Sequence, residues 1–384
     1  MSAVLCLLPD LSPTYNATPC QPCLMPVTDS AVAHPHIAIV RFSALGDVVM
    51  VAAAVQALRR ALPDARITWI TSPLAYALLD GMDGVNFVVT DKPRSWADYR
   101  AFYRLFRQRR YDVVLAMQAN LRINLLYPAL HAPVKIGFDR IRAREGQWLF
   151  CNRRIPCRDE HLLDGFLAFV TALTGAPAAA AWNLPLSASE YDWAKQHLAA
   201  LPRPLLALHP VSSKRERNWP AERYARLIEL AVKFFDCGVV ITGGTAPEEI
   251  ALCARLARVS PAHTLDLCGH STPKQLAAVL AEANVLVAPD TAAVHLARAG
   301  GTPVVGLYAV ASARFSGPYQ RTEYCVDHHA EALRVFHGKE ADALPWNTRV
   351  HHPDAMALIE VDEVMEQLGR VLSVPVTENR GEST

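Results

Sequence analysis

Short, uninterrupted apolar runs recur along this chain, and most are followed by a polar turn and then by apolar residues at helical spacing. The first such unit begins with Ile-Ala-Ile-Val at residues 37–40, turns through Ser43 to Asp47, and continues at helical spacing up to Pro63. Strands of a parallel sheet are covered on both faces by their crossover helices, so they are apolar without alternation. The pattern therefore predicts an α/β fold built from parallel sheets.

The units fall into two similar series separated by a linker at residues 176–181. In the first series we expect strands at 37–40, 66–71, 85–90, 111–117 and 134–138, and helices at 48–62, 73–79, 96–109 and 160–174. In the second we expect strands at 205–209, 239–242, 264–267, 285–288 and 304–308, and helices at 220–235, after Pro247, at 273–283, after Asp290 and at 361–372.

A chain of 384 residues exceeds the length at which single cores usually stop growing, so two domains are expected. We place an N-terminal domain at residues 35–180 and a second domain at 181–352, followed by a final helix and a polar tail at 353–384. The formal net charge is only +1, so overall charge does not indicate a nucleic-acid partner. No apolar run is long enough to span a bilayer, which limits any membrane contact to a peripheral one.

Residues 1–34 are rich in proline and lack helical or strand periodicity, so we expect a disordered extension. The segment lacks the charged start of a signal peptide, and Met25 is an alternative start. The nine cysteines show no spacing typical of a disulfide framework, which favours a reducing, cytoplasmic location. We interpret the pair Cys20 and Cys23 as coincidental.

Polar residues follow the predicted strands of both halves, at the edge where open parallel sheets bind ligands. Asp47 follows the first strand, directly after Gly46, and the alternative to a catalytic role is a helix cap. The loop at 209–220 places Ser212, Ser213, Lys214 and Arg217 before a helix, an arrangement typical of a diphosphate site but also of a solvated basic turn.

Two further segments have the same placement. Gly243 and Gly244 precede Glu248 and Glu249, which either offset a helix dipole or accept hydrogen bonds from ribose hydroxyls. Residues 288–295 place Asp290, Thr291 and Ala292 at a turn that leads to His295, and their backbone N–H groups are suited to phosphate. The alternatives are a simple cap and, for His295, a satisfied helix histidine.

Several functional classes lack their motifs. No D-x-D pair and no His or Cys cluster with metal-ligand spacing occurs, so we expect no metal and no cofactor. The G-x-S-x-G elbow and the P-loop are also absent, which disfavours the common hydrolases and NTPases. No complete dinucleotide fingerprint follows a strand, which disfavours a nicotinamide-dependent oxidoreductase.

In their order and spacing, residues 41–48, 212–220, 243–249 and 289–295 together resemble the heptosyltransferase family, glycosyltransferase family 9. The resemblance implies a GT-B fold, with two Rossmann-like domains facing each other across a cleft. It also implies inverting, metal-independent transfer of heptose from ADP-heptose to a lipopolysaccharide core acceptor. In this family the final helix crosses back to the first domain, and the apolar stripe of helix 361–372 suits such docking.

The resemblance also implies roles for particular residues. Asp47 is the general base, on a loop with Ser43 and Gly46 that faces the acceptor. The donor-binding residues are Ser212, Ser213, Lys214, Arg217, Glu248, Glu249, Asp290, Thr291, Ala292 and His295. Either Lys214 or Arg217 takes the place of a family lysine that contacts the diphosphate. After residue 306 the chain departs from the turn that many members have, which leaves Ser312 and Arg314 as candidate substitutes.

Two other functions stay open: a GT-B transferase with another nucleotide or sugar, and a non-catalytic binding protein of the same fold. We expect the acceptor to be lipid-linked and the protein to lie peripherally at the cytoplasmic face of the inner membrane. Basic residues at 140–154 are the candidates for that contact, with a solvated basic surface as the alternative: Arg140, Arg142, Arg144, Arg153 and Arg154.

Overall fold

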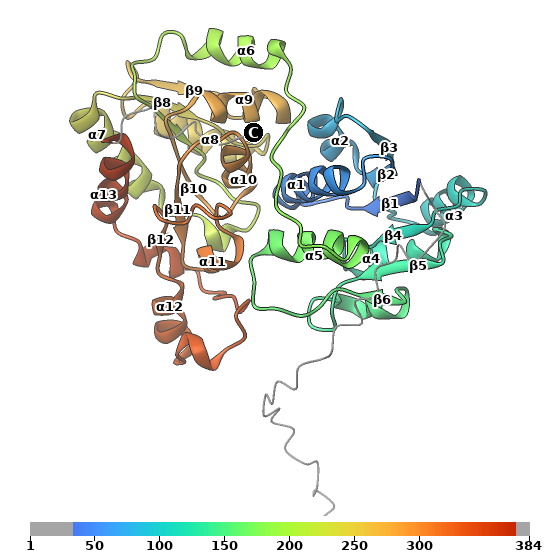
Figure 1. The fold of residues 1–384 in the computed structure, drawn as a ribbon. Coiled ribbons are helices and arrows are strands. Elements are labelled where there is room, and N and C mark those ends of the chain that lie inside the picture. The colour runs from blue at the N-terminus through green and yellow to red at the C-terminus, as the bar shows by residue number, and fades with distance from the viewer. Residues whose placement is uncertain (1–33, 374–384) are drawn as a thin grey trace, which may run out of the picture.

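The computed structural model describes residues 34–373, which form two six-stranded parallel sheets, one in each half of the chain (Figure 1). The strand order is β3-β2-β1-β4-β5-β6 in the first sheet and β12-β11-β10-β7-β8-β9 in the second. Counted within its own half, each sheet has the order 3-2-1-4-5-6 of doubly wound nucleotide-binding folds. The predicted α/β class with two Rossmann-like domains is confirmed. The predicted N-terminal extension lies almost entirely outside the described residues, as does most of the polar tail.

The elements of the first half are β1 (His36–Val40), α1 (Leu45–Ala61), β2 (Arg66–Thr71), α2 (Pro73–Leu79), β3 (Val85–Val89), α3 (Trp96–Phe106), β4 (Val113–Leu115), α4 (Leu121–Asn124), η1 (Tyr127–Ala129), β5 (Val134–Gly137), η2 (Arg144–Leu149), β6 (Arg153–Arg154) and α5 (Leu162–Thr174).

The second half begins with α6 (Ala188–Leu198), β7 (Leu205–Leu208), η3 (Arg215–Arg217), α7 (Ala221–Phe235), β8 (Gly238–Ile241), α8 (Pro247–Ala257), β9 (Thr264–Asp266), α9 (Pro273–Glu282), β10 (Val285–Pro289) and α10 (Ala292–Ala299). It ends with β11 (Val304–Tyr308), α11 (Ala313–Ser316), β12 (Val326–Asp327), α12 (His329–Ala332), η4 (Leu333–His337), η5 (Ala341–Ala343), η6 (Ala355–Leu358) and α13 (Val361–Leu372).

The central strand β1 shows why its sequence is apolar without alternation. Ile37 and Ile39 belong to the core on one face of the sheet, whereas Ala38 and Val40 belong to the core on the other face. Helices cover both faces, so successive side chains are buried although they point in opposite directions. Strand β10 repeats the arrangement in the second half.

Besides the four-residue helices α4, α11 and α12 and the short η segments, the sequence-based expectation lacked two strands and one longer helix. Strands β6 and β12 have two residues each and carry no apolar pattern of their own. Helix α6 lies between the expected linker and the second series, and it begins with a capping box in which Ser187 N donates to Glu190 Oε2 over 2.7 Å. This start signal is present in the sequence, but the helix buries only two of its residues and so lacks a broad apolar face.

The expected docking of the last helix on the first domain is wrong. Helix α13 packs on α7 and against β10, β11 and β12, all in the second half. Val364, Leu368 and Val371 are part of the core there, and Trp219 Nε1 donates to Ile359 O over 3.0 Å just before the helix begins. An apolar stripe predicts that a helix is packed, but it does not determine which of two apolar surfaces receives it.

The two halves meet through helices that follow their central strands. Helix α1 follows β1 and packs against α10, which follows β10 (Figure 1). No helix within residues 34–373 is both long and apolar enough to cross a membrane. The domain boundaries at residues 180 and 352 stay predictions.

Candidate active site

Four predicted site residues, Gly46, Asp47, Asp290 and His295, lie at the contact between the two halves. In each sheet the strand order reverses beside the central strand, between β1 and β4 and between β7 and β10. The loops after β1, β7 and β10 carry most of the polar residues singled out in the sequence, whereas Glu248 and Glu249 follow β8. Ligands of open α/β sheets bind at such reversal points. The contact between the halves is close at Gly46, where an added Cβ would lie 2.8 Å from His295 Cδ2.

Asp47 lies in the first turn of α1 and is held at one oxygen. Its Oδ2 forms an ion pair with Arg41 and accepts a hydrogen bond of 3.2 Å from Ala44 N. Arg41 in turn donates to Met117 O over 2.6 Å. The cap interpretation is therefore correct in part, but Oδ1 has no partner among the described residues, and the side chain is 26% exposed. One carboxylate oxygen is thus fixed and the other is free to accept a proton.

Asp290 is the buried counterpart of Asp47 in the second half. Its Oδ2 pairs with Arg217 Nη1 at 3.0 Å and accepts a hydrogen bond of 3.1 Å from Ser316 Oγ. Ser212 Oγ donates to its backbone oxygen over 2.9 Å. Burial raises the pKa of the Asp290 carboxyl, whereas the Arg217 charge opposes that shift. Ser316 was missed in the sequence because it lies 26 residues away, at the end of the short helix α11, which has no recognisable motif.

Helix α10 begins directly after this carboxylate. No side chain caps the helix, so the interpretation of Asp290 or Thr291 as a simple cap is wrong. The interpretation of His295 as a satisfied histidine is also wrong, because its Nδ1 is buried without a hydrogen-bond partner. Burial lowers the pKa of His295 to about 4, so the ring is neutral at physiological pH. An uncapped helix N-terminus offers N–H groups and positive potential to an anion.

The two cations considered for the diphosphate, Lys214 and Arg217, lie in different surroundings. Lys214 is exposed, as is Ser213, and neither makes a side-chain hydrogen bond among the described residues. Arg217 instead extends to Asp290, and its side chain is only 13% exposed.

The structure adds Arg349, a cation that no sequence motif had indicated. Burial and the Arg217 and Arg144 charges lower its pKa, while the carboxylates of Asp290 and Asp47 favour its charged form. Arg349 makes no hydrogen bond or ion pair with the described residues. Its guanidinium therefore lies in the field of both site carboxylates without being bound to either.

The two glutamates after the Gly-Gly turn differ in how firmly they are held. Glu249 Oε2 accepts a hydrogen bond of 2.6 Å from Gly244 N, which fixes the carboxylate beside the turn. Glu248 is mostly exposed and pairs loosely with the exposed Arg215 at 3.8 Å. Only Glu249 is thus positioned by the backbone.

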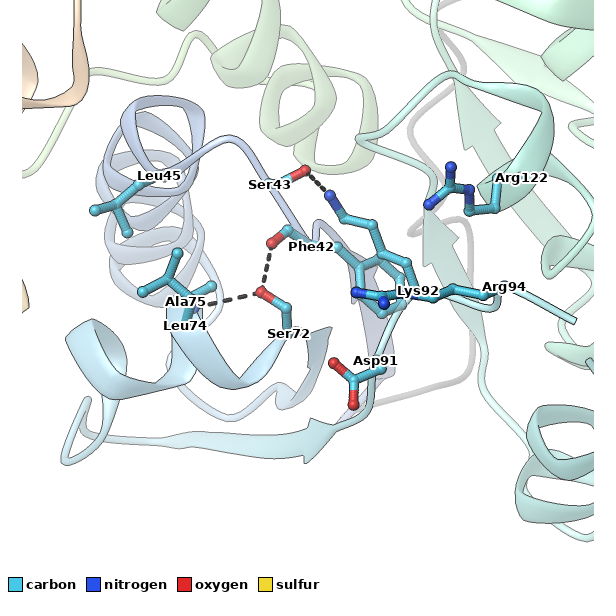
Figure 2. A pocket seen from close by; sticks show the side chains of 10 residues that line it. All are labelled: Phe42, Ser43, Leu45, Ser72, Leu74, Ala75, Asp91, Lys92, Arg94 and Arg122. Carbon is cyan, nitrogen blue, oxygen red and sulfur yellow. Dashed lines mark hydrogen bonds between the residues drawn. The ribbon is translucent and has the colours of Figure 1, made fainter. Parts of the chain in front are cut away.

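A pocket of about 280 Å³ opens beside the Asp47 loop, in the first half (Figure 2). Its lining includes Ser43, whose hydroxyl is bound by the Lys92 ammonium group, together with Arg94 and Arg122. Burial lowers the pKa of Lys92, and the Arg122 and Arg41 charges act in the same direction. Asp91 is the one acid among the ten lining residues, so the pocket is suited to an anionic group.

The basic segment at 140–154 is only partly available to a ligand. Arg142 is 11% exposed and pairs with Asp139 and with Glu160 Oε1, the latter at 2.9 Å. The expectation that Arg142 contacts an acceptor is therefore wrong, because these ion pairs occupy its guanidinium. Arg140, Arg144 and Arg154 are exposed.

Ser312 and Arg314 also have other partners. Ser312 donates to Asp327 Oδ2 over 2.9 Å, and Arg314 pairs with Asp159 of the first half at 3.1 Å. Among the described residues neither forms a hydrogen bond or ion pair with Asp290, whereas Ser316 donates a hydrogen bond to that carboxylate.

Comparison with known proteins gives the family. The model of the glycosyltransferase family 9 (heptosyltransferase) matches residues 99–343. The lipopolysaccharide core heptosyltransferase OpsX of Haemophilus influenzae is 31% identical over 338 residues, which cover 87% of this chain and 96% of that protein.

Solved structures share the fold. A glycosyltransferase of family 9 from Veillonella parvula has a TM-score of 0.71 at 18% identity and covers 88% of this chain and 97% of its own. The heptosyltransferase WaaC of E. coli with ADP has a TM-score of 0.66 at 20% identity and covers 88% and 99%. By the family match and the relative of 31% identity, this chain belongs to glycosyltransferase family 9, the heptosyltransferases.

Proposed function

We propose that this chain transfers heptose from ADP-heptose to a lipopolysaccharide core acceptor, with inversion at the anomeric carbon and without a metal ion. Membership of the family and the name of the relative from Haemophilus influenzae support the substrates. The observation that carries the proposal is the position of Asp47, whose helix packs directly against the uncapped helix that follows Asp290. A base and an anion site thereby meet at one junction.

Asp47 is the proposed general base. Inverting transfer needs a group that takes the proton from the acceptor hydroxyl while its oxygen attacks the anomeric carbon. Arg41 and Ala44 N fix Oδ2, so Oδ1 is available for that proton without reorientation of the side chain. A base that is already in position contributes typically 10²- to 10⁴-fold to the rate.

The second half supplies the proposed donor site. The N–H groups of Thr291 and Ala292 and the guanidinium of Arg349 stabilise the leaving diphosphate, because negative charge develops there as the sugar departs. Arg217 positions Asp290, which accepts hydrogen bonds from the donor sugar. Glu249 accepts hydrogen bonds from the ribose through the oxygen that Gly244 N leaves free.

The pocket around Ser43 is the proposed acceptor site. Ser43, which lines the pocket, is four residues before Asp47 in the sequence. The pocket's cations Lys92, Arg94 and Arg122 favour an acceptor with carboxylate or phosphate groups. An anionic saccharide held there presents a hydroxyl to the Asp47 loop. Arg41 links the pocket to the base: it forms an ion pair with Asp47, and its positive charge also acts on Lys92 in the pocket.

We further propose that the first half contacts the cytoplasmic face of the inner membrane. Residues 92–158 contain 15 Lys and Arg against four Asp and Glu, in a chain whose net charge is only +1. Large apolar side chains are exposed in the same region, among them Trp96, Leu121, Trp148 and Leu149. Exposed aromatic and apolar groups among cations are typical of surfaces that bind anionic lipids.

The elements that carry these side chains are adjacent. Tyr99 and Tyr103 of α3 donate hydrogen bonds of 3.0 Å to backbone oxygens of Arg122 and Leu125, in and just after α4. Asn124 of α4 donates to Arg144 O of η2, also over 3.0 Å. A membrane contact here lies beside the acceptor pocket, because Arg94 and Arg122 line that pocket.

The test of catalysis is Asp47→Asn, which keeps the size and one oxygen of the side chain but removes its basicity. We expect kcat to fall by about 10²- to 10⁴-fold, while the dissociation constant of ADP, measured by calorimetry, stays unchanged. Asp64→Asn, at an exposed acid just after α1, is the matched control and is expected to keep full activity. Transfer at the normal rate by Asp47→Asn would exclude Asp47 as the base.

The test of the donor is calorimetric titration of the wild-type protein with ADP, UDP and GDP, with and without EDTA. Selective binding of ADP in both conditions is the expected result. A preference for UDP or GDP would keep the transferase and change the donor. No binding of any nucleotide, together with no transfer, would favour a non-catalytic protein of this fold.

A further inference from the structure

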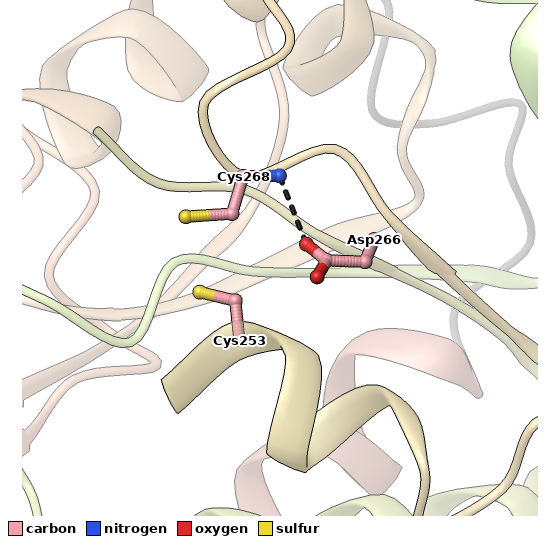
Figure 3. A group of neighbouring side chains, drawn as sticks. All are labelled: Cys253, Asp266 and Cys268. Carbon is pink, nitrogen blue, oxygen red and sulfur yellow. Dashed lines mark hydrogen bonds between the residues drawn. The ribbon is translucent and has the colours of Figure 1, made fainter. Parts of the chain in front are cut away.

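Three side chains of types that bind metal ions lie together in the second half (Figure 3). They are next to the Gly-Gly turn, where Cys268 Sγ contacts Gly244 O. Cys253 comes from α8, Asp266 ends β9, and Cys268 follows that strand two residues later. One ligand atom from each residue lies within 4.8 Å of the others. Cys253 and Cys268 are 0% and 1% exposed. The sequence spacing did not reveal the group, because residues 253 and 268 are joined only through the fold.

A backbone oxygen brings the number of possible metal-ligand atoms to four. Cys268 Sγ donates a hydrogen bond of 3.4 Å to Gly244 O, so this carbonyl points at the thiol. Asp266 Oδ1 accepts a hydrogen bond of 2.9 Å from Cys268 N, which positions the carboxylate and leaves its second oxygen unbound. In a tetrahedral zinc site with Zn–S near 2.3 Å and Zn–O near 2.1 Å, neighbouring ligand atoms are about 3.4–3.8 Å apart. The 3.4 Å between Sγ and O already matches such an edge.

Gly243 allows the two sulfurs to lie here. A Cβ at this position would be 2.6 Å from Cys268 Sγ and 3.5 Å from Cys253 Sγ. Both thiols therefore pack against the backbone of the turn that also carries Gly244 N, the donor to Glu249. Any ion bound by the thiols lies directly behind that turn.

We propose that Cys253, Cys268 and Asp266, with Gly244 O, bind one divalent cation of Zn²⁺ type. Two thiolates and a carboxylate together carry more negative charge than is needed to balance a divalent cation. Thiolate ligands favour Zn²⁺ over Mg²⁺ or Ca²⁺. The ion replaces the two thiol protons, which pass to solvent. It joins α8 to the loop after β9 and fixes the Gly-Gly turn. The site is structural: it takes no part in sugar transfer, and it stands or falls independently of the proposed function.

The test uses the full chain with Cys20→Ser and Cys23→Ser, so that this N-terminal pair cannot bind the probe. The reduced, metal-free protein is titrated with Cd²⁺, whose thiolate complexes absorb in the ultraviolet, and with Zn²⁺ followed by elemental analysis. We expect one ion per chain, a thiolate-to-Cd²⁺ absorption band, and a rise in Tm by a few degrees on addition of Zn²⁺.

Three variants identify the ligands. Cys253→Ser with Cys268→Ser is expected to abolish the band, whereas Cys237→Ser, at another buried cysteine of the same half, keeps it. Asp266→Asn retains an oxygen for Cys268 N, so it preserves the fold, yet it is expected to weaken binding by at least about tenfold. The proposal is overturned if the reduced protein binds no ion, if the double serine variant keeps the band, or if Asp266→Asn binds as tightly as the parent.

Discussion

At the scale of single residues, the junction between the two halves holds polar groups that the protein itself does not satisfy. His295 Nδ1 and Arg217 Nε are buried without hydrogen-bond partners among the described residues, and the guanidinium of Arg349 has no direct partner there. Buried polar groups without a partner cost free energy, and in native proteins they are rare. Their concentration around Asp290 is what we expect of a site that is completed by a polar ligand.

Arg349 is expected to carry much of the affinity for the diphosphate. Arg349→Ala removes a half-buried cation, and we expect the dissociation constant of ADP to rise about tenfold or more, because charge-assisted hydrogen bonds contribute about 1.5–3 kcal/mol. Arg215→Ala is the control, since that side chain is 90% exposed and pairs only loosely with Glu248. Equal affinities of the two variants, measured by calorimetry, would remove Arg349 from the donor site.

His295 is expected to make stability depend on pH. Burial lowers its pKa to about 4 in the folded state, whereas an unfolded chain has an ordinary histidine pKa of about 6.5. As the pH falls from 6.5 towards 4, the unfolded state takes up a proton that the folded state does not, so the free energy of unfolding decreases; below 4 this loss is complete. Buried His161 and His209, whose pKa values burial also lowers to about 4, act in the same direction.

The share of His295 is measurable by substitution. Urea unfolding of the parent and of His295→Gln at pH 7 and pH 5 is expected to show a loss of stability on acidification that is about 2 kcal/mol smaller in the variant. His270→Gln, at an exposed histidine, serves as the control and is expected to behave as the parent. An identical loss in His295→Gln and the parent would contradict the lowered pKa.

At the scale of elements, the contact of α1 with α10 sets the distance between the base and the donor site. Gly46→Ala places a Cβ 2.8 Å from His295 Cδ2 and 3.3 Å from Ala292 Cα, so the helices must separate. We expect a loss of about 1–3 kcal/mol in stability and a decrease in kcat, because Asp47 moves with α1. Gly369→Ala in α13 meets only Phe235 at 3.9 Å and is expected to be neutral or stabilising. Unchanged kcat in Gly46→Ala would show that the helix contact does not set the geometry.

At the scale of the whole molecule, the concentration of positive charge in one half predicts how the protein meets a membrane. We expect sedimentation with vesicles that contain anionic phospholipid, little binding to neutral vesicles, and weaker binding as salt increases. Trp148→Ala with Leu149→Ala removes exposed apolar groups, and Arg140→Ala with Arg154→Ala removes exposed charges; each pair is expected to reduce binding several-fold.

The control for this prediction lies in the other half. Phe234→Ala removes a side chain that is 65% exposed on α7, and it is expected to leave vesicle binding unchanged. Binding that is equally strong on neutral vesicles, or equally weakened by Phe234→Ala, would contradict a membrane contact through the basic region. Transfer to a lipid-free acceptor is measured in parallel, so that loss of membrane binding is distinguished from loss of catalysis.

Much of the fold followed from local patterns. Continuous apolar runs predicted the central strands, because a strand covered on both faces has no polar side, as Ile37 and Ala38 show in opposite cores. The position of Asp47, Asp290 and the loop after β7 at strand ends was likewise predictable, because parallel strands end at one edge of the sheet. The helix α6 and the two-residue strands were missed, since they bury too little to leave a pattern.

The sequence by itself determined the two parallel sheets, the strand-end positions of the polar residues and, through its motifs, the family. Only the tertiary structure decided that α13 packs on the second half. It alone brings Arg349 and Ser316 to Asp290, and Cys253 to Cys268, although these residues are far apart in the chain. It also alone shows that the guanidinium of Arg142 is occupied by ion pairs. The physical reason is the separation along the chain of the residues that interact. Periodicity and strand ends are properties of a few neighbouring residues, whereas these contacts join segments that only folding brings together.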